Sequence, residues 1–191
     1  MNFDVLWRYL PSLLSGFGVT VLCWSAGGAL GVVLGFGLAL LRRLDFPPLR
    51  WTLRAFVEVF RGTPFLMQLF LLYAGGPYID LRLSATAAGI LGLGLYSSAY
   101  FAEIFRGGFA AVPAIVNMLI VLSKETVVLS IITVPELMYQ MQTMAAETFT
   151  AFDAIFAMAV FYWLLVETVS RLGARAEARV TAYMAVEGGR A

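Results

Sequence analysis

Two short motifs place a carboxylate and a guanidinium three residues apart at the ends of apolar stretches. Glu58 precedes Arg61, Glu103 precedes Arg106, and a glycine follows each arginine. Residues three apart share one face of a helix, so each pair can form an ion pair or bind a common partner. A charge within a membrane-spanning helix costs about 2.5–3.5 kcal/mol or more, so it usually faces protein or a water-filled cavity. The repeated motif indicates a multi-span membrane protein that uses these groups.

A second charged cluster, Lys124-Glu125-Thr126, interrupts another apolar stretch near its middle. This position is too deep for the side chains to reach the membrane surface easily. Adjacent residues on a helix point about 100° apart, so Lys124 and Glu125 each need a separate partner or water. Two interpretations stay open: a buried ion pair between helices, or the wall of a translocation pathway.

A helix break is predicted directly after the first charged pair. Arg61 is followed by Gly62 and, two residues later, by Pro64. Proline removes a backbone hydrogen bond and kinks a helix, and glycine loosens the same turn. The kink is interpreted either as a hinge that opens a cavity or as a static bend from which Arg61 reaches the interface.

The composition is that of a membrane protein. Of the 191 residues, 61% are hydrophobic and 13% are charged, and the mean hydropathy is +0.85. Soluble domains carry about 25% charged residues. The net charge of +1 offers no basic surface for nucleic acid. Cys23 is the single cysteine, so an internal disulfide is excluded.

No constellation of residues indicates catalysis. The sequence has no histidine, which is the commonest general base and metal ligand. A serine–lysine dyad would need Lys124, the only lysine, and being its sequence neighbour does not give Ser123 the required geometry. There is no glycine-rich phosphate loop with a lysine. We therefore expect no catalytic residue, metal or cofactor in this chain, and no ATP hydrolysis by it.

Five stretches are long enough to cross a bilayer, which takes about 20 residues of helix. Residues 1–17 are expected to form an interfacial segment anchored by Trp7 and Tyr9. The sequence predicts an all-α membrane protein with a transmembrane domain over residues 18–172 and a cytoplasmic tail over 173–191. Its spans are expected at about 18–41, 55–73, 83–105, 114–134 and 152–172.

Small residues recur every four positions in the first span, at Gly27, Gly31 and Gly35. This spacing places them on one face, where it lets a neighbouring helix approach closely. We interpret the three glycines as a packing seam with no transport role of their own.

The arginines predict the orientation in the membrane. With the N-terminus outside, the cytoplasmic segments hold nine arginines and the outer segments hold two, Arg8 and Arg82. Cytoplasmic loops carry an excess of basic residues, so this orientation is favoured. The N-terminus is expected to be a retained span, because its apolar run exceeds the about 7–15 residues of a signal peptide core.

Three groups of motifs follow one another along the chain. They are Phe60-Arg61-Gly62-Thr63-Pro64-Phe65; Ala99-Tyr100-Phe101-Ala102-Glu103-Ile104-Phe105-Arg106-Gly107-Gly108-Phe109 with Val112-Pro113; and Leu122-Ser123-Lys124-Glu125-Thr126 with Val134-Pro135-Glu136-Leu137. In this order they resemble the permease subunits of polar amino acid ABC importers, the histidine/glutamine permease family. The resemblance covers most of the chain, from the first span to the fifth.

The resemblance implies a type I ABC importer permease fold in the bacterial inner membrane, with the N-terminus outside and the C-terminus cytoplasmic. It also implies partners: a second permease subunit, identical or homologous, and an extracytoplasmic amino acid-binding protein. A cytoplasmic ATPase dimer would bind ATP and magnesium. Alternating access driven by ATP would move a polar amino acid inward.

Site residues follow from combining the resemblance with the charged clusters. An acidic group would receive the substrate ammonium, and a basic or hydroxyl group its carboxylate. The candidate substrate-binding residues are Glu103, Lys124, Glu125, Thr126, Ser97 and Tyr100. Gating or structural roles are expected for Glu58, Arg61, Gly62, Pro64 and Arg106.

One segment departs from the family. After its Val-Pro the family carries a long cytoplasmic loop, with a Glu-Ala-Ala signature and a coupling helix that docks on the ATPase. Here Val112-Pro113 runs directly into Ala114. Met144-Ala145-Ala146-Glu147 is no substitute, because the predicted topology puts it on the other side of the membrane. Two alternatives therefore stay open: an uncoupled scaffold or regulatory subunit that lost the loop, and a carrier driven by an ion gradient.

Overall fold

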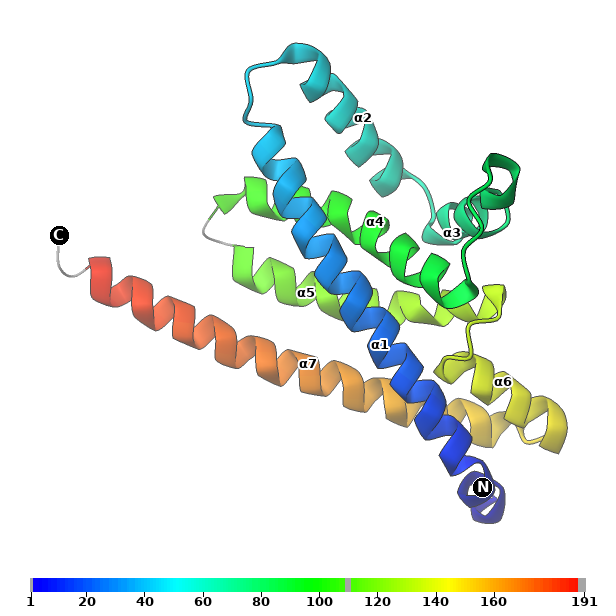
Figure 1. The fold of residues 1–191 in the computed structure, drawn as a ribbon. Helices are drawn as coiled ribbons and strands as arrows, with labels where there is room; N and C mark the ends of the chain where they lie inside the picture. The colour runs from blue at the N-terminus through cyan, green and yellow to red at the C-terminus, as the bar shows by residue number, and fades with distance from the viewer. Residues whose placement is uncertain (1, 109–110, 189–191) are drawn as a thin grey trace.

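The computed structural model describes residues 2–108 and 111–188, and within them it contains helices and their connections, with no strand (Figure 1). The predicted all-α membrane class is confirmed. Four helices are long and apolar enough to cross a membrane, and one bent helix pair gives a fifth candidate span. The elements are α1 (Phe3–Leu41), α2 (Pro47–Gly62), α3 (Phe65–Tyr73), η1 (Gly76–Ile79), α4 (Ala85–Arg106), α5 (Ala111–Glu125), η3 (Thr126–Ile132), α6 (Leu137–Thr148) and α7 (Ala151–Gly188).

The two terminal helices are longer than the spans predicted within them. Helix α1 is continuous from Phe3, so residues 3–17 extend the first span without a break, even though Pro11 lies inside the helix. This extension packs against α6, because a Cβ added at Gly16 would lie 2.6 Å from the Gln140 Cγ. Helix α7 likewise continues past residue 172, to Gly188. The interfacial position of residues 1–17 stays a prediction.

Helices α1 and α4 pack through the glycine seam, which confirms the close approach that the spacing predicts. A Cβ added at Gly27 would lie 2.7 Å from the Leu93 Cβ, and one at Gly35 would lie 2.5 Å from the Phe101 Cβ. Neither separation is available to real Cβ atoms, so only glycine permits this distance between the helices. The seam fixes the position of α4, and with it that of Glu103.

The main core lies where α1, α3, α4, α5 and η3 meet. Its buried members are Cys23, Phe65, Leu69, Ala88, Leu93, Tyr96, Phe101, Met118, Leu122, Leu129, Ile132 and Val134. Cys23 is fully buried as a free thiol, as expected of a small core residue without a disulfide partner. A second cluster joins α1, α6 and α7 around Leu13 and Met144.

The stretch predicted as one span over residues 55–73 is two helices, α2 and α3, whose axes differ by 109°. The predicted kink at Gly62–Pro64 is confirmed and is a complete break, because Thr63 is extended and Pro64 starts the next helix. The Gln68 side chain bridges the break, with its Nε2 donating to the Phe60 carbonyl at 2.8 Å and the Thr63 carbonyl at 3.1 Å. Whether the bend is a hinge or static stays open.

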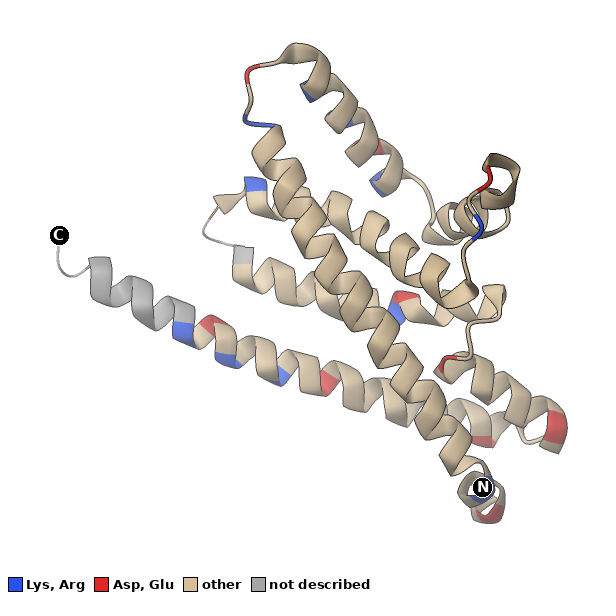
Figure 2. Cartoon of the chain, in the orientation of Figure 1, with Lys and Arg blue, Asp and Glu red and all other residues tan. Residues whose placement is uncertain are grey.

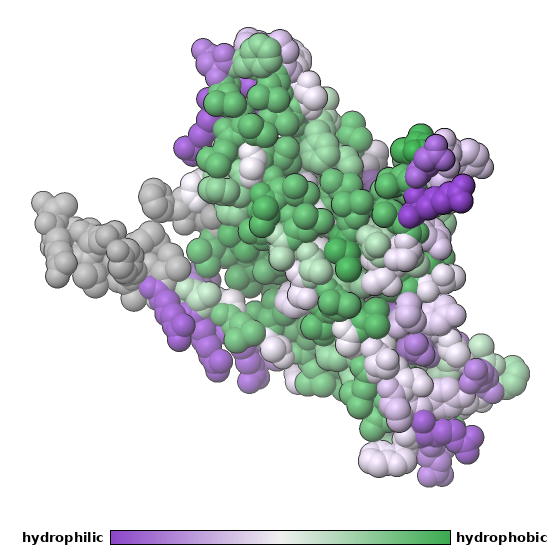
Figure 3. Space-filling view, viewed as in Figure 1, coloured by the Kyte–Doolittle hydropathy of each residue, from purple (hydrophilic) through white to green (hydrophobic). Residues whose placement is uncertain are grey.

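The outer surface is broadly apolar, with hydrophilic residues gathered toward the ends of the molecule (Figure 3). Val33, Leu71 and Trp163 are exposed on three different helices, as expected of residues that face lipid or another subunit. Basic residues gather at one end of the molecule: at the C-terminal ends of α1 and α4 and on α7 between Arg171 and Arg179 (Figure 2).

Candidate functional site

A cavity of about 480 Å³ opens between α2 and the C-terminal ends of α1 and α4. Its walls carry charges of both signs, which is unusual within a chain this apolar. They are formed by Arg42, Arg54, Val57, Glu58, Arg61, Gly62, Tyr100 and Glu103. The structure therefore brings Glu58, Arg61 and Gly62, three of the expected gating or structural residues, into the same space as Glu103 and Tyr100, two expected substrate contacts.

Glu103 lies between two arginines. Its Oε1 accepts a hydrogen bond from Arg42 Nη1 at 2.5 Å, and its Oε2 accepts one from Arg106 Nε at 2.9 Å. The Arg106 pair is the i,i+3 pair that the motif predicts. Arg42, at the end of α1, was not among the candidates, because only the glycine seam brings it to α4. The carboxylate is thus already neutralised within the chain.

The matching motif on α2 behaves differently. Within the described residues, Glu58 and Arg61 make no ion pair with each other or with any other side chain. The Arg61 guanidinium instead lies over the Tyr100 ring, 5.5 Å from its centroid, which is cation–π distance. Tyr100 in turn packs on Tyr96, whose hydroxyl donates to the Tyr100 hydroxyl at 3.5 Å. This contact links the bent α2–α3 pair to α4.

Ser97, another expected substrate contact, lies on a different face of α4. Its hydroxyl is buried and donates to the Leu93 carbonyl at 2.7 Å. A Cβ added at Gly31 would lie 1.9 Å from the Ser97 Oγ, so this side chain fills the space left by the seam glycine. The geometry therefore favours the packing interpretation of Ser97, although its substrate role stays a prediction.

Lys124 and Glu125 lie where α5 passes into the 3-10 turn η3. Lys124 is exposed and Glu125 is half-buried, and neither has an ion pair or hydrogen bond through its side chain in the described part of the chain. They do not pair with each other, as expected of adjacent residues on a helix. Two charges of opposite sign, neither with an ion pair in the described chain, thus lie next to each other where the α-helix passes into 3-10 geometry.

Thr126 belongs to a different, buried polar cluster. Its hydroxyl donates to the Ser123 carbonyl at 2.7 Å and lies 3.1 Å from the Tyr162 hydroxyl on α7. Tyr162 also donates to Glu136 Oε2 at 3.4 Å, and the Thr20 hydroxyl of α1 donates to the same oxygen at 3.3 Å. The cluster joins α1, η3, α6 and α7, and neither Lys124 nor Glu125 donates or accepts a hydrogen bond in it.

Glu136 was overlooked as a polar centre by the sequence interpretation. It precedes α6 and caps it, since its Oε1 accepts a hydrogen bond from the Tyr139 N–H at 2.8 Å. Burial raises the pKa of this carboxyl to about 7, against hydrogen bonds that lower it. A carboxylate after Pro135 and before an apolar run is a helix-start signal that could have identified the cap.

These observations define a class: a multi-span helical membrane protein with a mixed-charge cavity beside a broken helix. The resemblance inferred from the motifs is confirmed, because the chain is similar over nearly its whole length to permeases of amino-acid ABC transporters. No family model matches the chain.

Among curated proteins, the chain is 28% identical to a probable amino-acid ABC transporter permease, YckA of Bacillus subtilis, over 85% of this chain and 90% of YckA. It is 29% identical to a probable amino-acid ABC transporter permease, PatM of Vibrio harveyi, over 94% of this chain and 96% of PatM. These alignments extend over 204 and 214 residues, more than the 191 of this chain. The relatives therefore contain residues that this chain lacks.

A solved structure shares the fold. The crystal structure of an amino acid ABC transporter with histidines superposes with a TM-score of 0.88 at 27% identity, over 94% of this chain and 99% of that one. The arrangement of α1 to α7 is therefore that of a permease subunit in an amino acid transporter.

Proposed function

We propose that this chain is the membrane-spanning subunit of an ATP-driven importer that moves a polar amino acid inward by alternating access. The observation that carries the proposal is the similarity in both sequence and fold to amino-acid ABC transporter permeases. The cavity adds a water-accessible space lined by carboxylates and guanidiniums beside the broken helix, although Lys124 and Glu125 do not line it.

Lys124 and Glu125 are the proposed substrate contacts. Lys124 would receive the substrate carboxylate and Glu125 its ammonium, because both charges lack a partner in the described chain and a zwitterion supplies the two opposite charges. Ser97 and Thr126 donate their hydroxyl hydrogens within the chain and would support the helices instead.

Glu103 and Tyr100 are proposed to form part of the wall of the mixed-charge cavity. Arg42 and Arg106 hold the Glu103 carboxylate, so it would act through the cavity's electrostatics rather than as the ammonium receptor. Arg61 on Tyr100 would couple any movement of the α2–α3 bend to α4. Glu58, Gly62 and Pro64 complete this proposed gating region.

The proposed complex contains a second permease subunit, a cytoplasmic ATPase dimer that binds ATP and magnesium, and an extracytoplasmic binding protein. The relatives named above support this assembly in general terms, because each is a permease of an ABC transporter. The proposed location is the bacterial inner membrane with the N-terminus outside. Its support is the concentration of arginines at one end of the molecule.

The test is amino acid uptake into proteoliposomes that contain the chain, its cognate ATPase, its partner permease and the binding protein. We expect uptake that requires ATP and persists with a protonophore. Uptake without ATP that collapses with a protonophore would instead identify a carrier driven by an ion gradient. No uptake of any amino acid would favour the scaffold alternative.

The substrate contacts are tested in the same assay with Lys124→Met and Glu125→Gln. Losing a hydrogen bond to a charged group costs about 1.5–3 kcal/mol, so we expect KM to rise about 10- to 100-fold. Arg175→Gln is the control, because Arg175 is exposed on α7 and its side chain forms no hydrogen bond or ion pair within the described residues. Unchanged KM in both test variants would refute the assignment.

A further inference from the structure

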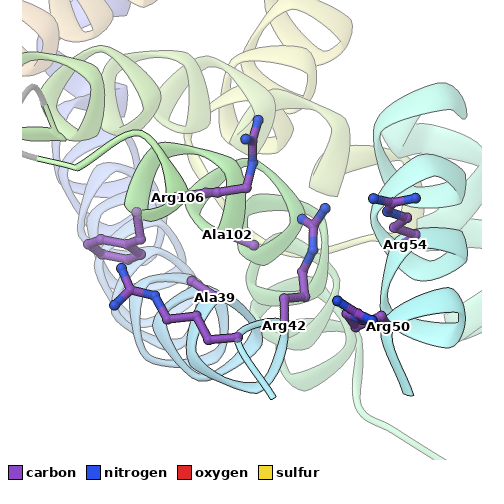
Figure 4. Close-up of a pocket in the computed structure, with 8 residues that line it drawn as sticks. Ala39, Arg42, Arg50, Arg54, Ala102 and Arg106 are labelled. Carbon is purple, nitrogen blue, oxygen red and sulfur yellow. The ribbon is translucent and has the colours of Figure 1, made fainter. Parts of the chain in front are cut away.

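A second cavity, of about 240 Å³, lies at the end of the molecule where α1 and α4 finish. Five of its eight lining residues are arginines, and Ala39, Ala102 and Phe105 complete the lining. We call it the arginine pocket: Arg42, Arg43, Arg50, Arg54 and Arg106. Figure 4 shows Arg50 and Arg54 of α2 lying across the opening from Arg42 and Arg106.

The arginine pocket carries uncompensated positive charge. Glu103 pairs with Arg42 and Arg106, and Asp45 pairs with Arg50 at 3.1 Å. Two carboxylates against five guanidiniums leave an excess of three positive charges. Arg43 and Arg54 have no carboxylate partner within the described residues. Guanidinium groups bind phosphate through paired N–H donors, so the pocket is suited to a phosphate group.

The surroundings indicate where that phosphate comes from. The α1–α2 connection and the first turns of α2 expose large apolar side chains next to the pocket: Leu44 is 52% exposed, Phe46 58% and Trp51 72%. Trp51 lines a further hollow together with Arg50 and Arg54. Aromatic and leucine side chains beside arginines at the end of a spanning helix mark the membrane–water boundary. A soluble anion would gain nothing from these exposed apolar side chains.

We infer that the arginine pocket binds the phosphate of an anionic phospholipid headgroup. The acyl chains of this lipid extend along the exposed apolar residues of α1 and α2, among them Leu40 and Leu41. The bound lipid offsets part of the excess charge and joins the end of α1 to α2. Arg42 belongs both to this pocket and to the mixed-charge cavity, so lipid binding bears directly on the cavity wall.

The test is native mass spectrometry of the full-length chain in detergent, titrated with phosphatidylglycerol and, separately, with phosphatidylcholine. The variant is Arg43→Gln with Arg50→Gln, neither of which lines the mixed-charge cavity. Both side chains are exposed, and loss of Arg50 strands only Asp45, which is 95% exposed, so folding is preserved. The matched control is Arg175→Gln with Arg179→Gln, which removes the same charge from exposed positions on α7.

We expect phosphatidylglycerol to bind in preference to phosphatidylcholine, and the pocket variant to bind it about 10- to 30-fold more weakly, at about 1 kcal/mol per basic residue. The control pair should bind like the parent chain.

An equal loss in both variants, or no preference for the anionic lipid, would overturn the inference. Displacement of the lipid by an equal concentration of inorganic phosphate would show that the site takes a soluble anion. Displacement by the cognate ATPase would show a protein docking site, and either result overturns the lipid assignment.

Discussion

The carboxylates of this chain differ in their surroundings more than in their sequence context. Glu103 forms ion pairs with two arginines, whereas Glu58 has no ion pair in the described chain. Glu136 is fully buried and accepts hydrogen bonds from two hydroxyl groups. Their positions along the chain did not reveal this difference. Arg42 meets Glu103 from 61 positions away in sequence, and Thr20 meets Glu136 from 116. Such partners depend on tertiary packing.

The buried Glu136 carboxyl should make stability depend on pH. Its pKa is raised from 4.5 to about 7 in the folded state, so folding favours the protonated carboxyl. The contribution of this group to the free energy of unfolding is therefore complete below about pH 4.5. That stability is lost as the pH rises through about 7, with a total on the order of 3 kcal/mol. We expect the melting temperature of the parent chain to fall between about pH 5 and pH 8. The melting temperature of Glu136→Gln, whose side chain does not titrate, should fall less over the same range.

Glu177→Gln is the control for this pH series, because Glu177 is exposed on α7. It should follow the parent chain at every pH. A Glu136→Gln curve parallel to that of the parent chain would show that this carboxyl does not titrate in the folded state.

Loss of the Glu103 carboxylate should destabilise the end of α4. Glu103→Gln leaves the Arg42 guanidinium, whose side chain is only 17% exposed, without its ion pair. A buried charged group left without its partner costs about 1–3 kcal/mol or more. Glu167→Gln is the matched control, because its pair with Arg171 is exposed and should contribute less than about 1 kcal/mol. Equal melting temperatures for the two variants would contradict the buried role of Glu103.

At the scale of elements, the α1–α4 seam sets the geometry of the cavity. A Cβ at Gly35 would lie 2.5 Å from the Phe101 Cβ and 2.9 Å from the Ser98 carbonyl oxygen. Gly35→Ala should therefore force the helices apart, at a cost of about 1–3 kcal/mol. Gly37→Ala, two residues along on the same helix, has no atom within 4 Å of its added Cβ and should be tolerated. Melting temperatures of the two variants test the seam, and an equally mild Gly35→Ala would contradict it.

One side chain, that of Gln68, forms hydrogen bonds across the bend between α2 and α3. Gln68 donates to two carbonyls that the break leaves without helical partners. We expect Gln68→Leu to lower the melting temperature, since the two part-buried carbonyls lose their donor, and even a fully buried unpaired carbonyl costs no more than about 1–3 kcal/mol. Exposed Gln142→Leu on α6 is the control. A stable Gln68→Leu chain with altered transport would favour the hinge interpretation over the static bend.

Element-scale features were more predictable than side-chain directions. Apolar length identified the spanning stretches and four-residue spacing identified the seam, because both depend on local periodicity. Pro64 indicated a kink and favours an extended Thr63 before it, but the 109° angle between α2 and α3 depends on tertiary packing, which the sequence did not specify. Ser97 faces the seam rather than the cavity, and only the structure distinguishes these two faces of α4.

At the scale of the molecule, the arginines divide the structure into two ends. The arginine pocket and the stretch of α7 from Arg171 to Arg179 lie at one end, while the start of α1 and α6 lie toward the other (Figures 1 and 2). The orientation expected from the arginine count stays a prediction. The coupling loop concerns how the whole chain would bind its ATPase. The sequence passes directly from Val112-Pro113 to Ala114. The relatives contain residues that this chain lacks.

The most direct measurement for the proposed function is co-purification of the chain with its cognate ATPase, followed by ATP hydrolysis in liposomes with and without loaded binding protein. Stable association and hydrolysis stimulated by the loaded binding protein are the results we expect of a coupled importer subunit. Failure to associate, reversed when a family coupling loop is inserted after Pro113, would contradict the account and identify the chain as an uncoupled permease.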